Sequence, residues 1–253
     1  MAGMESEGQR VALVTGSSRG LGSAVARRLA RDGMAVAVNG LRGDDLVAEV
    51  AEAIRDDGGT AAAITGDVTD EGQVDELVSA IARTFGPVDV LVLNATGPQP
   101  DITVEDATWD DHLDQLRFFV KSPLLLGRAV LPAMRAGRWG RIVHVDSEVA
   151  DRPPPHRSAY ATAKAAQVGL ALSWARELAP LGITVNTVAP GFVPVERHAD
   201  VPDDVRAAYV ASVPVGRFGT RDEIAHAVSF FASDAAAYVT GQRLVLDGAR
   251  RLG

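Results

Sequence analysis

Tyr160 and Lys164 stand four positions apart in the segment SAYATAK, residues 158–164. On a helix, residues at i and i+4 share a face, so the phenol and the amine would lie side by side. A neighbouring ammonium favours the phenolate and lowers a pKa that is about 10 in a free tyrosine. This prepares the phenol to exchange a proton with a carbonyl or alcohol oxygen. Because the chain has only three tyrosines and two lysines, a chance pair is rare, and we interpret this one as catalytic rather than solvent-facing.

Ser147 follows the apolar run RIVHVD (141–146), thirteen positions before Tyr160. Its hydroxyl could donate a hydrogen bond to a substrate oxygen and so fix the orientation of the substrate. The alternative is a simple turn at the end of a strand. We favour the catalytic interpretation because the serine closes a strand just before the tyrosine–lysine pair.

The segment TGSSRGLG (15–22) follows the first apolar run and opens a helical pattern. Gly16 permits a tight turn, Gly20 lets the backbone approach a phosphate, and Gly22 allows close packing of helix and sheet. The helix N-terminus offers free N–H groups and a partial positive charge to a pyrophosphate. The alternative is a structural turn, but the position after the first strand favours a nucleotide site.

Seven apolar segments alternate with segments of helical periodicity along the chain. Most are near-continuous apolar runs, as expected for strands of a parallel sheet covered on both faces. We therefore predict the α/β class, as a Rossmann-type doubly wound fold with a seven-stranded parallel sheet. The predicted strands are residues 11–15, 35–39, 61–65, 88–94, 141–146, 183–188 and 243–247.

No linker or repeat divides the sequence, so we predict one domain over residues 1–253 with a flexible N-terminus at 1–9. Residues 105–137 are long enough for one extended helix or two short ones. Residues 192–220 form an irregular insertion rich in Pro, Asp and Val. Ligands of such folds bind beyond the carboxyl ends of the strands, so we expect this insertion to serve as a substrate loop or lid.

The composition excludes several function classes. A net charge of −8 argues against a nucleic-acid partner, and no apolar run is long enough to span a membrane. Cysteine is absent, so we expect neither a disulfide framework nor a thiolate metal site, and we predict no metal-binding residues. The polar start of the sequence lacks the apolar stretch of a signal peptide, and we expect a cytoplasmic protein.

Together, the glycine spacing G-x-x-x-G-x-G and the YATAK segment resemble the short-chain dehydrogenase/reductase family, including its 3-oxoacyl-ACP-reductase-like members. The resemblance extends to GDVTD (66–70), RIVHVDS (141–147), VNTVAPGF (185–192) and YVTGQRLVLDGA (238–249). It implies that Tyr160 is the acid/base, that Lys164 modulates its pKa and holds the nicotinamide ribose, and that Ser147 binds the substrate oxygen. It also implies a homo-oligomer, either a tetramer or a dimer.

The resemblance further implies a set of cofactor contacts. Asp67 and Val68 would border the adenine, Asn94 and Ala95 the adjacent ribose, and Pro190, Gly191 and Val193 the nicotinamide. The complete implied set is Gly16, Ser18, Arg19, Gly20, Leu21, Gly22, Asn39, Gly40, Leu41, Asp67, Val68, Asn94, Ala95, Tyr160, Lys164, Pro190, Gly191 and Val193.

The end of the second predicted strand bears on the choice of cofactor. An NAD enzyme usually places a carboxylate there to bind the ribose 2′-hydroxyl, whereas this sequence has Asn39, Gly40 and Leu41. Arg19 and Arg42 could instead face a 2′-phosphate, although Arg42 could equally be a solvated loop cation. We therefore expect NADP(H) in preference to NAD(H).

The sequence also departs from the family pattern. Residues 101–140 contain no asparagine, whereas relatives usually carry one that holds a water in the proton relay. Phe119 falls near that position, and our hypothesis is that Lys121 or Ser122 takes over the role; the alternative is a surface lysine. Val195 replaces a threonine that often contacts the cofactor carboxamide.

Polar residues around Ser147 leave the substrate open. His156 could shape the substrate site or lie in solvent. Asp146 and Glu148 could favour a cationic or hydroxyl-rich substrate, or they could point away from the site.

We expect an NADP(H)-dependent oxidoreductase that reduces a ketone or oxidises a secondary alcohol. The best single substrate is a 3-oxoacyl thioester or a related small ketone. One alternative is non-redox chemistry on the same scaffold, by a dehydratase, cyclase or isomerase. A nucleotide-sensing protein without activity is a further alternative, which an intact Ser–Tyr–Lys set disfavours.

Overall fold

The seven predicted strands form a single parallel sheet in the computed structural model, which describes residues 8–252. The strand order is β3-β2-β1-β4-β5-β6-β7, so the prediction of a seven-stranded parallel sheet is confirmed. The strands are β1 (Val11–Val14), β2 (Ala35–Val38), β3 (Thr60–Ala63), β4 (Val90–Leu93), β5 (Gly140–Val145), β6 (Ile183–Pro190) and β7 (Arg243–Leu246).

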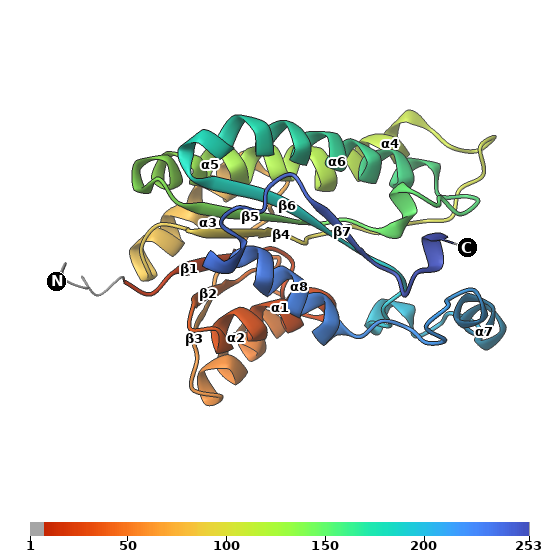
Figure 1. Cartoon of the computed structure of the whole chain (residues 1–253), viewed down its shortest axis with the longest axis horizontal. Helices are drawn as coiled ribbons and strands as arrows, with labels where there is room; N and C mark the ends of the chain where they lie inside the picture. The colour runs from red at the N-terminus through yellow and green to blue at the C-terminus, as the bar shows by residue number, and fades with distance from the viewer. Residues whose placement is uncertain (1–7, 253) are drawn as a thin grey trace.

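Helices cover both faces of this sheet, with α1, α2 and α8 on one face and α3, α5 and α6 on the other (Figure 1). Successive side chains of a strand point to opposite faces, so Leu13 joins one apolar core and Val14 the other. The helices are α1 (Gly20–Arg31), α2 (Leu46–Asp56), α3 (Glu71–Thr84), α4 (Trp109–Leu116), α5 (Ser122–Gly137), α6 (Ser158–Leu178), α7 (Asp203–Ala211) and α8 (Arg221–Ala232).

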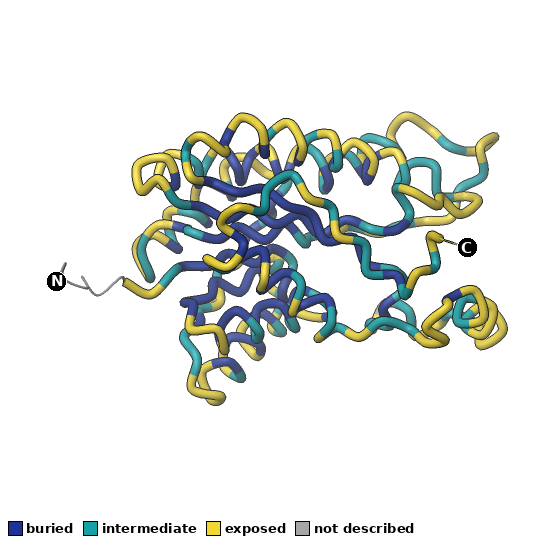
Figure 2. Tube along the Cα trace, viewed as in Figure 1, coloured by how far each residue is buried: buried dark blue, intermediate teal, exposed yellow. Residues whose placement is uncertain are grey.

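The carboxyl ends of the parallel strands meet at one edge of the sheet. At that edge β1 and β4 are neighbours, and the chain leaves them in opposite directions across the sheet, which is the point where such folds bind ligands. The tube in Figure 2 shows the central strands buried, whereas the loops beyond them are exposed or half-buried. The fold therefore brings the predicted site residues to one rim.

Residues 109–137 form one continuous helical segment rather than two separate helices. A π-helical turn, Arg117–Lys121, joins α4 to α5. The capping box of Thr108 and Asp111 fixes where α4 begins. Phe119, a buried residue, lies within this turn.

The segment 192–220 contains helix α7, which the sequence analysis did not predict. Four aromatic rings hold this helix against the loop after β6: Phe192 lies 5.3 Å from Tyr209, 5.1 Å from Phe218 and 4.7 Å from His198, between ring centroids. A role as a lid stays a prediction. The predicted flexible N-terminus falls almost entirely on residues 1–7, which lie outside the described residues.

Within residues 8–252, none of the helices combines the length and the apolar character needed to cross a membrane.

Candidate active site

Tyr160 and Lys164 lie one turn apart on helix α6. The buried stripe of this helix runs through Lys164, Gln167, Ala171 and Ala175, at the spacing of one helix face. Lys164 is only 3% exposed, and Nζ donates a hydrogen bond of 2.8 Å to the carbonyl of Val145. Tyr160 precedes it by a turn and is half-buried, at the end of α6 nearest the carboxyl ends of the strands. Lys164 therefore faces the sheet, whereas Tyr160 lies at the partly exposed end of the same helix face.

Ser147 begins the short 3-10 turn Glu148–Ala150 directly after β5, and this turn packs on α6. Its hydroxyl oxygen accepts a 3.3 Å hydrogen bond from the Val149 amide. Lys164 donates to the carbonyl two residues before Ser147, so the end of β5 lies against this face of α6. The structure thus brings together the three residues that the sequence analysis predicted as catalytic.

Phe119 is the residue of the α4–α5 segment that contacts this pair. Its ring centroid lies 3.9 Å from Nζ of Lys164 and 5.5 Å from the Tyr160 ring, in an edge-to-face arrangement. Lys121 is exposed, which supports the alternative of a surface lysine, whereas Ser122 is buried. An aromatic ring therefore contacts both members of the pair, and a role of Ser122 in the proton relay stays a prediction.

The glycine-rich loop between β1 and α1 forms a cradle that side chains would obstruct. A Cβ at Gly22 would lie 2.3 Å from the Gly16 carbonyl oxygen, and one at Gly16 would lie 2.9 Å from Cα of Ala95. Gly16 and Gly20 both have positive φ values, of 61° and 59°. Helix α1 has no side-chain cap and no acidic residue in its first turn, so its N–H groups can receive an anion. These observations fit a bound dinucleotide phosphate.

Two asparagine side chains tie the loops of the cradle together. Asn94 Nδ2 donates to the carbonyls of Thr15 and Gly16, at 2.9 and 3.0 Å. Asn39 is 2% exposed; its Oδ1 accepts from the Gly16 amide, and its Nδ2 donates to the carbonyls of Ile64 and Gly66. Asn39 therefore organises the loop, and its side chain is turned into the protein.

The remaining predicted adenosine contacts surround this cradle. Asp67 is half-buried and accepts hydrogen bonds from the amide and hydroxyl of Thr69, while Val68 is buried. Ser18 is buried, and Leu41 is 59% exposed. Gly40 lies beside Asp44 and Ser18, so its backbone borders the same space as the glycine loop.

Arg19 and Asp44 form an ion pair of 3.3 Å at the entrance to the cradle. The Asp44 carboxylate lies next to both Gly40 and the Arg19 guanidinium. Arg42 pairs instead with Glu76 at 2.5 Å, and both side chains are exposed. Of the two arginines, Arg19 is thus the one that borders the cradle.

Beyond β6, the chain turns back over the cradle. The Gly191 amide donates to the Leu246 carbonyl at 2.9 Å, and a Cβ at this glycine would lie 2.7 Å from the Tyr209 hydroxyl. Val193 is buried, and Val195 comes within 3.5 Å of a Cβ built on Gly20. The predicted nicotinamide contacts Pro190, Gly191 and Val193 therefore lie between the glycine loop and α7.

Asp146 and Glu148 are both held by arginines. The Asp146 side chain is fully buried and pairs with Arg243 of β7 at 2.7 Å; Arg243 also donates to the Ser147 carbonyl and to Asp151. Burial raises the pKa of Asp146, against the opposing effects of Lys164 and Arg243. Glu148 pairs with Arg250 at 3.1 Å. Both acids are thus paired with arginines around Ser147, which the sequence analysis did not predict.

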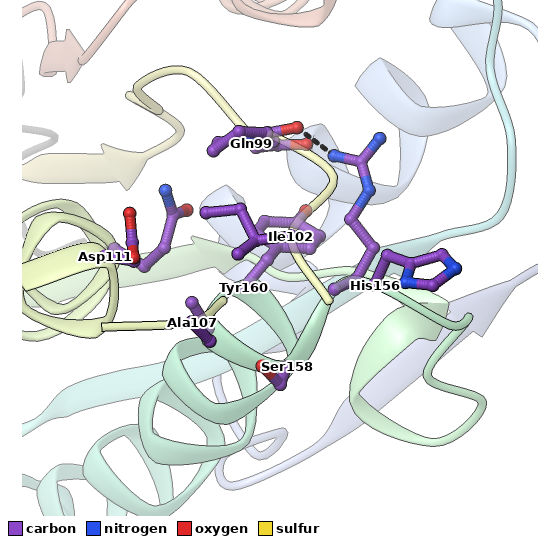
Figure 3. A pocket seen from close by; sticks show the side chains of 11 residues that line it. Gln99, Ile102, Ala107, Asp111, His156, Ser158 and Tyr160 are labelled. Atoms are coloured by element: carbon purple, nitrogen blue, oxygen red, sulfur yellow. Dashed lines mark hydrogen bonds between the residues drawn. The ribbon is translucent and has the colours of Figure 1, made fainter. Parts of the chain in front are cut away.

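A pocket opens beside Tyr160, between the loop after β4 and the start of α6 (Figure 3). Gln115 lies in it: Nε2 donates to the Pro98 carbonyl, while Oε1 is buried without a hydrogen-bond partner among the described residues. His156 is exposed, and its ring points away from Tyr160 in Figure 3. The lining residues are Gln99, Pro100, Ile102, Ala107, Asp111, Gln115, His156, Arg157, Ser158, Ala159 and Tyr160.

Sequence reasoning missed the roles of Gln167, Tyr209, Arg243 and Arg250 around this site. A signal existed for Gln167, a polar residue one turn after Lys164 on the same helix face. The other three bond Asp146 or Glu148, which lie 61 to 102 positions away along the chain, and no local pattern marks these contacts.

Comparison with known proteins agrees with this geometry. The sequence model of the family described as Enoyl-(Acyl carrier protein) reductase matches residues 16–249. The 3-oxoacyl-(acyl-carrier-protein) reductase FabG of Escherichia coli is 40% identical over 242 residues, which cover 94% of this chain and 96% of that protein.

Two solved structures extend the comparison. The 3-oxoacyl (acyl-carrier-protein) reductase of Agrobacterium tumefaciens with NADP bound has a TM-score of 0.88 at 37% identity, covering 95% of this chain and 94% of that one. A gluconate 5-dehydrogenase from Burkholderia cenocepacia, in complex with NADP and tartrate, has a TM-score of 0.91 at 31% identity, covering 97% and 96%. The chain therefore belongs to the short-chain dehydrogenase/reductase family, an oxidoreductase family whose motifs it carries along nearly its whole length.

Proposed function

We propose that this protein is an NADP(H)-dependent reductase of ketones, which can also oxidise the corresponding secondary alcohols. The observation that carries the proposal is the placement of Tyr160, Lys164 and Ser147 at the carboxyl edge of the sheet, beside the glycine cradle. The relatives named above, whose titles include reductases and NADP complexes, support it. They do not favour non-redox chemistry.

Each residue of the set has a distinct task. When bound, the nicotinamide cofactor supplies or accepts the hydride. Tyr160 gives a proton to the substrate oxygen during reduction and takes it back during oxidation. The Lys164 ammonium favours the phenolate, and Ser147 donates a hydrogen bond that holds the substrate oxygen in place.

We assign NADP(H) rather than NAD(H) because Arg19 borders the cradle and the residues directly after β2, Asn39 to Leu41, include no carboxylate. The adenosine phosphate would bind to Arg19, and the pyrophosphate to the N-terminus of α1. The remaining contacts of the predicted set, from Gly16 to Val193, would enclose the cofactor along the carboxyl edge.

The substrate that best fits the relatives is a 3-oxoacyl thioester. A second candidate is a hydroxylated acid, because polar groups of Gln99, Asp111, Gln115 and Arg157 line the pocket beside Tyr160. The gluconate dehydrogenase likeness supports that candidate.

The proposed assembly is a homo-oligomer, a tetramer or a dimer. The large apolar side chains of Leu124 on α5 and Leu172 on α6 are 44% and 51% exposed, which suits helices that pack on a second copy. Light scattering of the purified protein would give the number of copies. A cytoplasmic location stays a prediction.

The decisive experiment has two steps. Fluorescence titration with NADPH and NADH measures cofactor binding, and NADPH oxidation is then followed with acetoacetyl-coenzyme A and with a keto-gluconate. Tyr160→Phe should bind NADPH normally and lose at least a thousandfold in turnover. Binding without turnover on any ketone, or a Tyr160→Phe variant that turns over normally, would refute the proposal.

A further inference from the structure

Three uncharged groups contact the Lys164 ammonium. Its Nζ donates to the Val145 carbonyl at 2.8 Å and to Oε1 of Gln167 at 3.1 Å. The Phe119 ring faces it at 3.9 Å from the centroid. The ring centroid of Tyr160 lies 5.8 Å from the same nitrogen, so the phenol is close enough for its acidity to depend on this charge.

Phe119 contacts both members of the pair with one ring. The residue is 2% exposed, and its ring meets the Tyr160 ring at an interplanar angle of 68°. An aromatic face attracts a cation through its quadrupole, and it does so without neutralising the charge. Phe119 therefore stabilises the protonated form of Lys164. The same ring packs the π-helical turn 117–121 against α6.

Gln167 contacts the same nitrogen, Nζ of Lys164, from the next turn of α6. It is 1% exposed and lies three residues after Lys164, within the buried stripe of the helix. Its amide oxygen accepts from the ammonium without adding a negative charge. A glutamate of the same shape would form an ion pair there and cancel much of the field that reaches Tyr160.

Two titratable groups at β5 lie near this ammonium. Asp146, directly after β5, interacts electrostatically with Lys164 and forms an ion pair with Arg243 of β7, and both partners are present in every variant tested below. His144, on β5, is completely buried; burial and, in addition, the Lys164 charge lower its pKa to about 3, so that it is neutral.

We propose that Phe119 and Gln167 are positioning residues of the active site, which hold the Lys164 ammonium beside Tyr160 through uncharged contacts and so keep the phenol acidic. The inference rests on the proposed function, because it concerns the acid/base pair of that reaction. It assigns a task to two side chains that touch neither the substrate oxygen nor the reacting carbon.

The test measures the acidity of Tyr160 directly. The chain has three tyrosines, so the ultraviolet absorbance of phenolate, titrated in each protein and in its Tyr160→Phe counterpart, gives the Tyr160 pKa by difference. Gln167→Glu should raise that pKa by about one unit or more, and Phe119→Leu should raise it by a smaller amount. Gln167→Met, which removes the acceptor without adding charge, should raise it by less than Gln167→Glu.

A second readout and a matched control complete the experiment. The pH at which alcohol oxidation reaches half its maximal kcat should move upward with the phenol, while the KM of the alcohol stays within twofold. Phe231→Leu removes a ring that is also 2% exposed, on α8 across the sheet, and should move neither value.

Unchanged Tyr160 acidity in folded Gln167→Glu and Phe119→Leu, or an equal shift in Phe231→Leu, would overturn the inference. A shift in phenol acidity in a protein without ketone turnover would instead uphold the inference and refute the proposed function.

Discussion

The Tyr209 hydroxyl donates a 2.8 Å hydrogen bond to Oε1 of Glu148, the residue that follows Ser147. The same hydroxyl accepts a 2.6 Å hydrogen bond from the Phe192 amide, at the start of the loop after β6. Burial, together with the neighbouring Glu148 carboxylate, raises the pKa of Tyr209, so the group remains a donor. One phenol thus connects helix α7, the serine turn and the predicted nicotinamide loop.

We expect Tyr209→Phe to loosen helix α7 over the site. The change leaves the Phe192 amide and the Glu148 carboxylate without this partner, which costs about 1–3 kcal/mol locally. The KM of the ketone should rise about three- to tenfold, and limited proteolysis within residues 192–220 should become faster. Tyr238→Phe is the control, because Tyr238 is fully exposed. Equal behaviour of the two variants would show that the hydroxyl does not hold the helix.

The cradle predicts a steric effect at Gly22. A Cβ there would overlap the Gly16 carbonyl at 2.3 Å and the Asn94 amide at 2.6 Å, so Gly22→Ala should destabilise the protein by about 1–3 kcal/mol. NADPH affinity should fall at least tenfold, as measured by fluorescence titration. Gly169→Ala makes the same exchange on α6 with nothing within 4 Å, and should stabilise by about 0.5–1 kcal/mol. Normal NADPH binding by Gly22→Ala would contradict the assignment of the cradle.

For the Arg19–Asp44 pair, we expect loss of the arginine and loss of the aspartate to change NADPH affinity in opposite directions. Arg19→Ala removes the cation that would bind a 2′-phosphate and should weaken NADPH binding about tenfold, with little effect on NADH. Asp44→Asn removes the competing carboxylate and should strengthen NADPH binding relative to NADH. Arg31→Ala, an exposed arginine elsewhere on α1, should change neither Kd. If Arg19→Ala weakened both cofactors equally, the preference for NADP(H) would have another origin.

His144 predicts how stability depends on pH. Burial lowers its pKa to about 3, with the Lys164 charge adding to the effect, and its ring nitrogens have no hydrogen-bond partner among residues 8–252. The unfolded chain protonates this histidine near pH 6.5, so it binds more protons than the folded state. The free energy of unfolding should therefore fall as pH decreases from about 6.5 towards 3, by up to about 1.4 kcal/mol per unit.

The His144→Phe variant isolates this contribution. Phenylalanine retains the edge-to-face contact with Trp174, whose ring lies 5.9 Å away, but it cannot take up a proton. Urea unfolding between pH 7.5 and 5 should show a flatter decline than in the native protein. His226→Phe, at an exposed position, should keep the native slope. Asp146, whose pKa burial raises, acts in the opposite direction and is present in all three proteins.

Sequence reasoning located all seven strands because strands that are buried on both faces have nearly continuous apolar sequences. It placed Tyr160 and Lys164 together because the periodicity of one helix determines their relation. It placed Phe119 near the position of the expected asparagine, but it did not predict that this ring contacts both Tyr160 and Lys164, because no local pattern links residue 119 to a helix about forty positions later.

Helix α7 escaped prediction for a different reason. None of its residues is buried, so its sequence has no apolar stripe that would reveal a helix. Its contacts come from single side chains such as Tyr209. The arginine partners of Asp146 and Glu148 were equally hidden, because charge pairing between distant segments leaves no periodic pattern.

Two ion pairs, Arg243–Asp146 and Arg250–Glu148, act as arginine clamps on the turn at Ser147. They also determine when the site can form during protein synthesis. Arg243 reaches Asp146 across 97 positions of sequence, and Arg250 reaches Glu148 across 102. A nascent polypeptide whose β5 and α6 have already folded beside the ribosome still lacks both clamps. Only after residue 250 leaves the exit tunnel can β7 close the edge of the sheet and the turn at Ser147 gain these ion pairs. Completion of the active site is thus tied to the last strand of the sheet, and chains released before it would emerge without a finished serine turn.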